Sequence, residues 1–112
     1  MKNIVILATG GTIAGISESI TDTASYRPAI LPIEEIIRGI DGPLHKIARI
    51  SSEQIAQIDS AEMTHQIWFT LANRINALLA DPSVDGVVVT HGTDTLEETA
   101  YFLNLVVKSA KP

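Results

Sequence analysis

The sequence predicts an α/β domain built on a parallel sheet, and three observations support this. Residues 4–8 and 86–90 are short aliphatic and β-branched runs that predict buried strands, and residues 4–8 are expected to form a central strand that is apolar on both faces. Residues 64–80 and 96–108 carry apolar side chains at the spacing of an α-helix. Strands and helices alternate along the chain, an order that is typical of parallel sheets with right-handed connections.

The first predicted strand, residues 4–8, leads into a glycine turn. Gly10 and Gly11 allow the backbone to change direction sharply there. Residues 16–29 are polar and aperiodic, and we expect a loop that acts as a lid. A helix is expected over residues 33–40, where isoleucines recur on one face. Pro32 suits its first turn, and Gly42-Pro43 is expected to end it.

The second half of the chain is more regular. Residues 47–50 and 54–58 are predicted as two short strand pieces. The helix over residues 64–80 is expected to end at Asp81-Pro82. After the strand at 86–90, a last helix over residues 96–108 is apolar nearly all round. Its first turn carries Glu97 and Glu98, which favour a helix N-terminus. Lys111-Pro112 then follows at a point where another strand is expected.

Composition narrows the classes of function. The 112 residues are 46% hydrophobic and 19% charged, which indicates one folded domain. A net charge of −5 without a basic block argues against nucleic acid and anionic membranes as partners. The sequence has no cysteine, so disulfides, thiolate catalysis and cysteine–zinc sites are excluded. No apolar run approaches the ~20 residues of a membrane span, and we expect no membrane partner.

A first candidate motif is Ala-Thr-Gly-Gly-Thr-Ile-Ala-Gly at residues 8–15. It has neither the glycine spacing of a dinucleotide-binding fingerprint nor the lysine of a phosphate-binding loop. It does place the Thr12 hydroxyl on a glycine turn beside exposed backbone N–H groups, an arrangement that suits a nucleophile with an oxyanion hole. The alternative is a tight turn after a strand with a solvated threonine.

A second candidate motif is Thr-His-Gly-Thr-Asp-Thr at residues 90–95, which also follows a predicted strand. Because ligands of open α/β sheets bind at the carboxyl ends of strands, the two motifs are expected to share one site. Thr93 and Asp94 supply a hydroxyl and a carboxylate. The alternative is that Thr93 or Asp94 caps the helix that begins near Leu96.

The remaining polar residues give weaker indications. His45, His65 and His91 lack the spacing of metal ligands, so no metal site is predicted. His91 is expected to organise its loop through a hydrogen bond. A Ser60–His91–Asp94 triad is conceivable but lacks a nucleophile-elbow motif. Tyr26 stands alone in a polar segment and, taken by itself, fits an exposed aromatic residue.

Taken together, the motifs at residues 8–15 and 90–95 resemble the two signatures of the bacterial L-asparaginase and glutaminase-asparaginase family. The similarity continues through Leu-Glu-Glu-Thr-Ala-Tyr-Phe-Leu at residues 96–103 and covers nearly the whole chain. The first motif is most similar to the type II, typically exported, branch. The resemblance implies a flavodoxin- or Rossmann-like amino-terminal domain, with further strands and a second, smaller domain beyond residues 1–112.

The resemblance also implies a reaction, in which the side-chain amide of L-asparagine is hydrolysed to L-aspartate and ammonia through a threonine acyl-enzyme. L-Glutamine is a possible second substrate in this family. Thr12 matches the nucleophile, Tyr26 the lid tyrosine that helps to activate it, and Thr93 the second catalytic threonine. No cofactor and no metal are implied. Gly10, Gly11 and Gly92 match the structural glycines of the two motifs.

Substrate binding is implied for a second set of residues. Ser60 matches the serine that holds the α-carboxylate, Asp94 the carboxylate that pairs with the α-ammonium, and Thr93 a further contact. Ala61 stands where many relatives carry Gln or Glu beside the substrate. Such a pairing of an anionic and a donor-rich group suits a zwitterionic substrate.

Two features of the family are not found within residues 1–112, namely the catalytic lysine that partners the second threonine and the carboxy-terminal domain. We therefore expect these residues to be the amino-terminal part of the large α/β domain. By the same resemblance we expect a homotetramer built of dimers, and a periplasmic or secreted location. The absence of a signal sequence at the start leaves a cytoplasmic location open. The alternatives are an amino-acid-binding module without catalysis and an inactive fragment.

Overall fold

The protein folds around a parallel sheet of three strands, in a computed structural model that describes residues 1–15, 27 and 29–112. Strands β1 (Lys2–Gly10), β2 (Ala48–Ile58) and β3 (Gly86–Thr90) lie in the order β2-β1-β3. Both neighbouring pairs are parallel. The predicted parallel α/β class is therefore confirmed, and the first strand is the central one.

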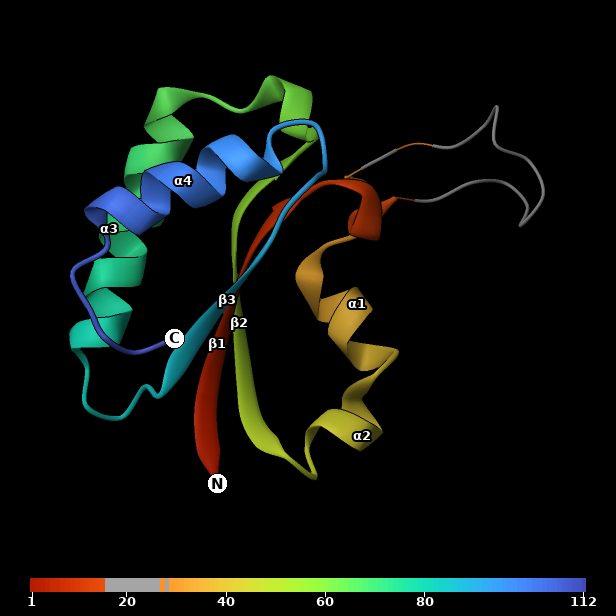
Figure 1. The fold of residues 1–112 in the computed structure, drawn as a ribbon. Helices are drawn as coiled ribbons and strands as arrows, with labels where there is room; N and C mark the ends of the chain where they lie inside the picture. Colours follow the sequence, from red (N-terminus) through yellow and green to blue (C-terminus); the bar gives the residue numbers. More distant parts are fainter. Residues whose placement is uncertain (16–26, 28) are drawn as a thin grey trace.

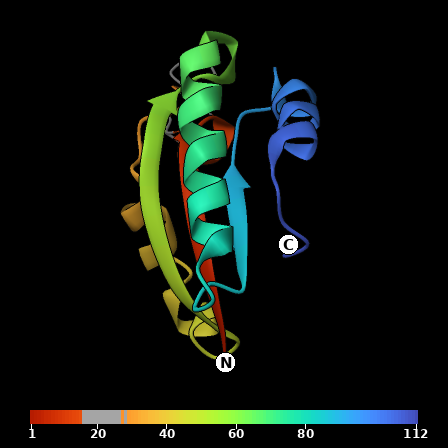
Figure 2. The ribbon, with the colours of Figure 1, turned by 90° about the vertical axis from the view of Figure 1, so that its left-hand side faces the viewer.

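Helices flank the sheet on both sides (Figure 1). The helices α1 (Ile33–Arg38) and α2 (Asp41–Leu44) lie on one side, and α3 (His65–Ala80) and α4 (Leu96–Val106) lie on the other. In Figure 2, α3 lies in front of the sheet, and α4 lies beyond β3 on the side away from β2. This arrangement leaves the upper end of the sheet in Figure 1 to loops and short helical turns.

The hydrophobic core lies between β1 and α3. Leu7 of β1 and Leu71 of α3 are both fully buried. The same cluster contains Val5, Ile75, Leu78, Leu79 and Val84. This is the apolar face that the spacing in residues 64–80 predicts. The Thr64 hydroxyl caps α3 by accepting the Ile67 N–H at 3.2 Å, and the helix ends before Asp81 as predicted.

The prediction of two separate strand pieces at residues 47–50 and 54–58 is wrong. Residues 48–58 form one strand, and its register runs without a break from Lys2 opposite Ala48 to Ala8 opposite Gln54. Residues 51–53, Ser-Ser-Glu, have low strand propensity on their own. Pairing with the central strand outweighs that propensity, because strand preference depends strongly on context.

Two helix boundaries also differ from the prediction. The helix at residue 33 ends at Arg38, and Gly42-Pro43 lies inside the short helix α2 rather than in a terminating turn. Pro43 is tolerated there because the first turn of a helix needs no backbone donor. Helix α4 ends at Val106 rather than at residue 108.

The end of α4 is fixed by a side chain from another element. Asn76 of α3 donates from Nδ2 to the Val106 carbonyl oxygen at 3.2 Å, and its Oδ1 accepts the Lys108 N–H at 2.7 Å. Helix carbonyls at a C-terminus have no partner within the helix. Asn76 supplies one for Val106, and no local pattern around residue 106 could indicate this.

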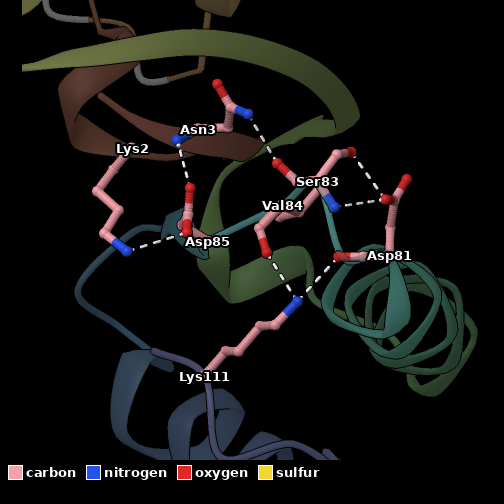
Figure 3. Close-up of polar contacts among 7 residues, drawn as sticks. All are labelled: Lys2, Asn3, Asp81, Ser83, Val84, Asp85 and Lys111. Atoms are coloured by element: carbon pink, nitrogen blue, oxygen red, sulfur yellow. Dashed lines mark hydrogen bonds and ion pairs between the residues drawn. The ribbon is translucent and has the colours of Figure 1, made fainter.

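At the amino end of the sheet, a polar cluster joins segments that are far apart in the sequence (Figure 3). One Asp85 carboxylate oxygen accepts the backbone N–H of Asn3 at 2.8 Å. Lys111 Nζ donates to the carbonyl oxygens of Asp81 and Val84, both at 2.8 Å. These contacts tie the start of β1 and the segment after α4 to the α3–β3 turn.

The predicted lid over residues 16–29 falls mainly on residues 16–26 and 28, which lie outside the described part. Within the described residues, no helix combines the length and apolar character needed to cross a membrane.

Candidate functional site

Three segments meet at the carboxyl ends of the strands, at the top of Figure 1. The 3-10 turn η1 (Thr12–Ala14) follows β1, and the 3-10 turn η2 (Ser60–Glu62) follows β2. Residues 91–95 connect β3 to α4. Both sequence motifs and Ser60 are therefore at one edge of the sheet, as the parallel arrangement predicts.

Gly11 of the first motif and Gly92 of the second are in close backbone contact. Gly11 has φ +83°, a left-handed conformation that favours glycine. A Cβ atom on Gly11 would lie against the Gly92 backbone, 2.6 Å from its Cα. Any side chain at position 11 would therefore push the second motif away.

Gly10 has a similar role on the other side of β1. Its φ is +93°, and a Cβ there would lie 2.7 Å from the backbone N and O of Ile58. Between Ala8 and Gly10 the register with β2 slips, so that Gly10 pairs with Ile58. The Gly11 N–H donates to the Ile58 carbonyl at 2.9 Å. This close approach brings the start of η1 next to the end of β2.

A buried hydroxyl joins the ends of β1 and β3. Thr9 is 2% exposed, and its Oγ1 donates to the Thr90 carbonyl oxygen at 2.7 Å. The bond continues the pairing of the two strands one step beyond their last ladder position, Ala8 opposite Thr90. Thr9 therefore fixes the point at which both motifs leave the sheet.

Ser60 is held by the second motif. It is 2% exposed, and its Oγ accepts the Asp94 backbone N–H at 3.0 Å. Its carbonyl oxygen accepts the Thr95 hydroxyl at 2.9 Å. A Cβ on Gly92 would lie 2.6 Å from Ser60 Oγ, so only glycine leaves room for this packing.

His91 organises its loop through hydrogen bonds, as predicted. Its Nδ1 lies 2.6 Å from the Gly92 carbonyl oxygen, which can only accept, so Nδ1 carries a proton. Its Nε2 lies 2.8 Å from Oγ1 of Thr99, a residue that is 2% exposed. Thr99 Oγ1 also accepts the Trp68 indole N–H at 2.8 Å. In a neutral ring the chain of donors therefore runs from Trp68 through Thr99 to His91.

This network does not form the conceivable Ser60–His91–Asp94 triad. The hydrogen bonds of both His91 ring nitrogens go to Gly92 and Thr99, and Ser60 Oγ bonds to a backbone N–H. The alternative in which Thr93 or Asp94 caps α4 is also wrong. Thr95 occupies the N-cap position, and its side chain makes no capping hydrogen bond. Glu97 and Glu98 do lie in the first turn, as predicted.

Thr93 and Asp94 are left exposed beside this buried framework, as is Ala61. The hydroxyl groups of Thr9, Ser60, Thr95 and Thr99 form this framework, because each is hydrogen-bonded to another group of the protein. The Thr93 hydroxyl and the Asp94 carboxylate are thus presented to solvent at the edge of the sheet, where they could contact a small polar molecule. No group of three or more His, Cys, Asp or Glu able to hold a metal is present within the described ranges.

The two remaining catalytic candidates are Thr12 and Tyr26. The backbone of Thr12 opens η1 directly after Gly11, but its side chain is not described. Tyr26 lies outside the described residues. Sequence reasoning missed three hydroxyl residues of the framework. Thr9 and Thr95 stand inside the two motifs, which was an available signal, whereas nothing local to Thr99 indicated its bonds.

The chain is similar to known proteins over nearly its whole length. Residues 3–112 match the family model described as "Asparaginase, N-terminal". All 112 residues align with L-asparaginase 2 of Bacillus subtilis at 54% identity, and with the glutaminase-asparaginase of Pseudomonas fluorescens at 49%. The chain spans 30% and 31% of these relatives' lengths.

A solved structure gives the same result for the fold. The crystal structure titled probable cytoplasmic L-asparaginase from Campylobacter jejuni aligns with 92% of the chain, and the chain covers 31% of that protein. The TM-score is 0.86 and the sequence identity is 48%. With the family model matched over residues 3–112, the chain belongs to the asparaginase family and corresponds to its N-terminal region.

Proposed function

We propose that these residues form part of an amidohydrolase that converts L-asparagine to L-aspartate and ammonia. The observation that carries the proposal is the convergence of Ser60, Asp94 and the Thr12 backbone at one edge of the sheet. Family membership supports the same class of reaction, because the relatives described above are named asparaginases and a glutaminase-asparaginase.

Substrate binding is proposed to use the two ends of the zwitterion. The exposed Asp94 carboxylate pairs with the α-ammonium group, and the Ser60 hydroxyl donates to the α-carboxylate. Ser60 Oγ accepts the Asp94 N–H, so the hydroxyl proton remains free to point toward a ligand. Thr93 and Ala61 border the same region, and both are exposed.

The proposed chemistry is nucleophilic. Thr12 Oγ attacks the side-chain amide carbon, the C–N bond breaks, and the hydroxyl proton leaves with ammonia. Water then attacks the resulting ester, the ester C–O bond to Thr12 breaks, aspartate is released, and a proton from the water restores the Thr12 hydroxyl. Backbone N–H groups of this turn, other than the Gly11 N–H that donates to the Ile58 carbonyl, stabilise the negative oxygen in each step. Tyr26 helps to activate Thr12, and Thr93 serves as the second catalytic threonine. No cofactor takes part in this scheme.

We propose that residues 1–112 act as the amino-terminal part of the large α/β domain of a longer enzyme. The support is that the chain spans about a third of each relative described above. A lysine that partners Thr93 and a second domain are then supplied by later residues, and the complete enzyme is a tetramer built of dimers. On this proposal, residues 1–112 alone are inactive.

Two finer properties follow the resemblance. L-Glutamine is proposed as a second substrate, which the name of the Pseudomonas relative supports. A periplasmic or secreted location follows the type II form of the first motif. The Campylobacter structure is titled cytoplasmic, so the alternative is a cytoplasmic enzyme. Fractionation of the source cells decides between them.

The proposal is tested by measuring ammonia and aspartate after the complete protein is incubated with L-asparagine. Equal amounts of the two products are expected, with slower release of ammonia from L-glutamine. Tight binding of asparagine without ammonia release would contradict the proposal and support the amino-acid-binding module instead.

A further inference from the structure

Thr95 occupies a helix N-cap position without acting as a cap. A threonine at the N-cap ordinarily accepts a backbone N–H from the first turn of its helix. Here no side-chain capping bond is made, and the Thr95 hydroxyl donates to the Ser60 carbonyl oxygen at 2.9 Å. Its hydrogen bond therefore joins two loops rather than stabilising α4.

This bond completes a two-point attachment between neighbouring residues. The Asp94 N–H donates to Ser60 Oγ at 3.0 Å, and the next residue along the chain holds the Ser60 carbonyl. Ser60 is 2% exposed, and the Gly92 backbone packs directly against its hydroxyl. Two bonds from consecutive residues fix both the distance and the orientation of Asp94 relative to Ser60, which a single bond would leave free to rotate.

We propose that Thr95 is a positioning residue that sets the spacing between the Ser60 hydroxyl and the Asp94 carboxylate. The inference rests on the proposed function, in which these groups bind the two ends of a zwitterionic amino acid. Loss of the Thr95 hydroxyl lets residues 94–95 move relative to η2. Both ends of the substrate are then held less well in the ground state and in the transition state alike, so the loss appears in KM.

The test compares Thr95→Val, which keeps the shape and removes the hydroxyl, with Thr95→Ser, which keeps the hydroxyl. The matched control is Thr70→Val on α3. Thr70 is exposed and also donates its hydroxyl to a backbone carbonyl, that of Gln66 at 3.0 Å. In the complete enzyme, Thr95→Val is expected to raise KM for L-asparagine about three- to tenfold. Its kcat stays within about twofold, and Thr95→Ser and Thr70→Val keep the KM of the wild type.

A second readout does not depend on turnover. Hydrogen–deuterium exchange of the peptide that carries Asp94 and Thr95 is expected to be faster in Thr95→Val and normal in Thr95→Ser. Unchanged exchange and an unchanged KM in Thr95→Val would overturn the inference, as would an equal rise in KM in Thr70→Val. If the wild type releases no ammonia, the proposed function fails. The inference is then decided by the exchange experiment alone.

Discussion

At the scale of single residues, the geometry of the site depends on glycines that allow close backbone contact and on threonine hydroxyls that join neighbouring segments. Gly11 and Gly92 allow two backbones to touch, and Thr9 and Thr95 join neighbouring segments through hydroxyl-to-carbonyl bonds. Of the residues proposed to contact the substrate, Thr93, Asp94 and Ala61 are exposed, whereas Ser60 is buried and is held in place by these neighbours. We therefore expect substitution of the glycines to lower stability, and substitution of the exposed binding residues to change the kinetic constants.

The glycine contact predicts a loss of stability. Gly11→Ala forces a Cβ into the Gly92 backbone and places alanine at φ +83°. We expect the free energy of unfolding to fall by more than about 2 kcal/mol, measured by urea denaturation. The control is Gly42→Ala in α2, where a Cβ meets no atom within 4 Å. Comparable stability of the two variants would contradict the packing described for the motifs.

Asp94 and Thr93, the two exposed residues of the second motif, are expected to affect different kinetic constants. Asp94→Asn removes the proposed charge partner of the α-ammonium and is expected to raise KM for asparagine by about ten- to a hundredfold. Thr93→Ala is expected to lower kcat with a smaller change in KM, because Thr93 is assigned to the chemical step. Steady-state ammonia release from both variants of the complete enzyme measures these constants. The reverse pattern would exchange the two roles.

At the scale of elements, the carboxyl end of β3 is supported by α3, which precedes it in the chain, and by α4, which follows it. The Trp68 indole on α3, the Thr99 hydroxyl on α4 and the His91 ring form one chain of hydrogen bonds. Trp68 also stacks on Phe102 with ring centroids 4.9 Å apart. The loop that carries Thr93 and Asp94 is therefore anchored to the α3–α4 layer.

The hydrogen bonds of Thr99 to Trp68 and His91 predict that two substitutions of Thr99 differ in their effect on stability. Thr99→Val leaves the Trp68 N–H and His91 Nε2 without their shared partner, at a cost of about 1–3 kcal/mol in unfolding free energy. Thr99→Ser retains the hydroxyl and is expected to lie within about 1 kcal/mol of the wild type. Thermal and urea unfolding of the two variants measure the difference. Equal stability would mean that the network carries no net stabilisation.

At the scale of the whole molecule, the two ends of the sheet have different roles. The carboxyl end carries the candidate site, and the amino end carries the polar cluster of Figure 3. The Asn3 N–H, and then the Lys2 ammonium, hold the pKa of Asp85 below its ordinary value. The Ser83 hydroxyl and N–H likewise lower the pKa of Asp81. The ionised forms of Asp81 and Asp85 therefore stabilise the folded state.

These shifts predict a loss of stability in acid. The ionised carboxylates contribute fully above their unfolded-state pKa values, and the contribution disappears as pH falls through the lower folded-state values. The urea midpoint is expected to fall between about pH 5 and pH 2. In Asp85→Asn the fall is expected to be smaller. A midpoint that rises on acidification, or the same slope in Asp85→Asn, would contradict the assignment.

Much of the fold followed from local patterns, because residues 4–8 and 86–90 are short apolar runs typical of strands and residues 64–80 carry the periodicity of a helix. The continuity of β2 did not, since Ser51, Ser52 and Glu53 adopt the strand only through pairing with β1. The end of α4 was missed because Asn76 acts on it from another helix. The two motifs predicted the place of the site, but the bonds of Ser60 to Asp94 and Thr95 join residues 34 and 35 positions apart. No local spacing encodes such contacts.

The central claim is that Thr12, placed by the contact between the two glycine motifs, becomes acylated during turnover. The most direct measurement is to quench the complete enzyme during hydrolysis of L-asparagine and examine its peptides by mass spectrometry. An aspartyl ester is expected on the peptide that carries Thr12, and neither the ester nor steady turnover is expected in Thr12→Val. Undiminished ammonia release by Thr12→Val, or an ester found on a different residue, would contradict it.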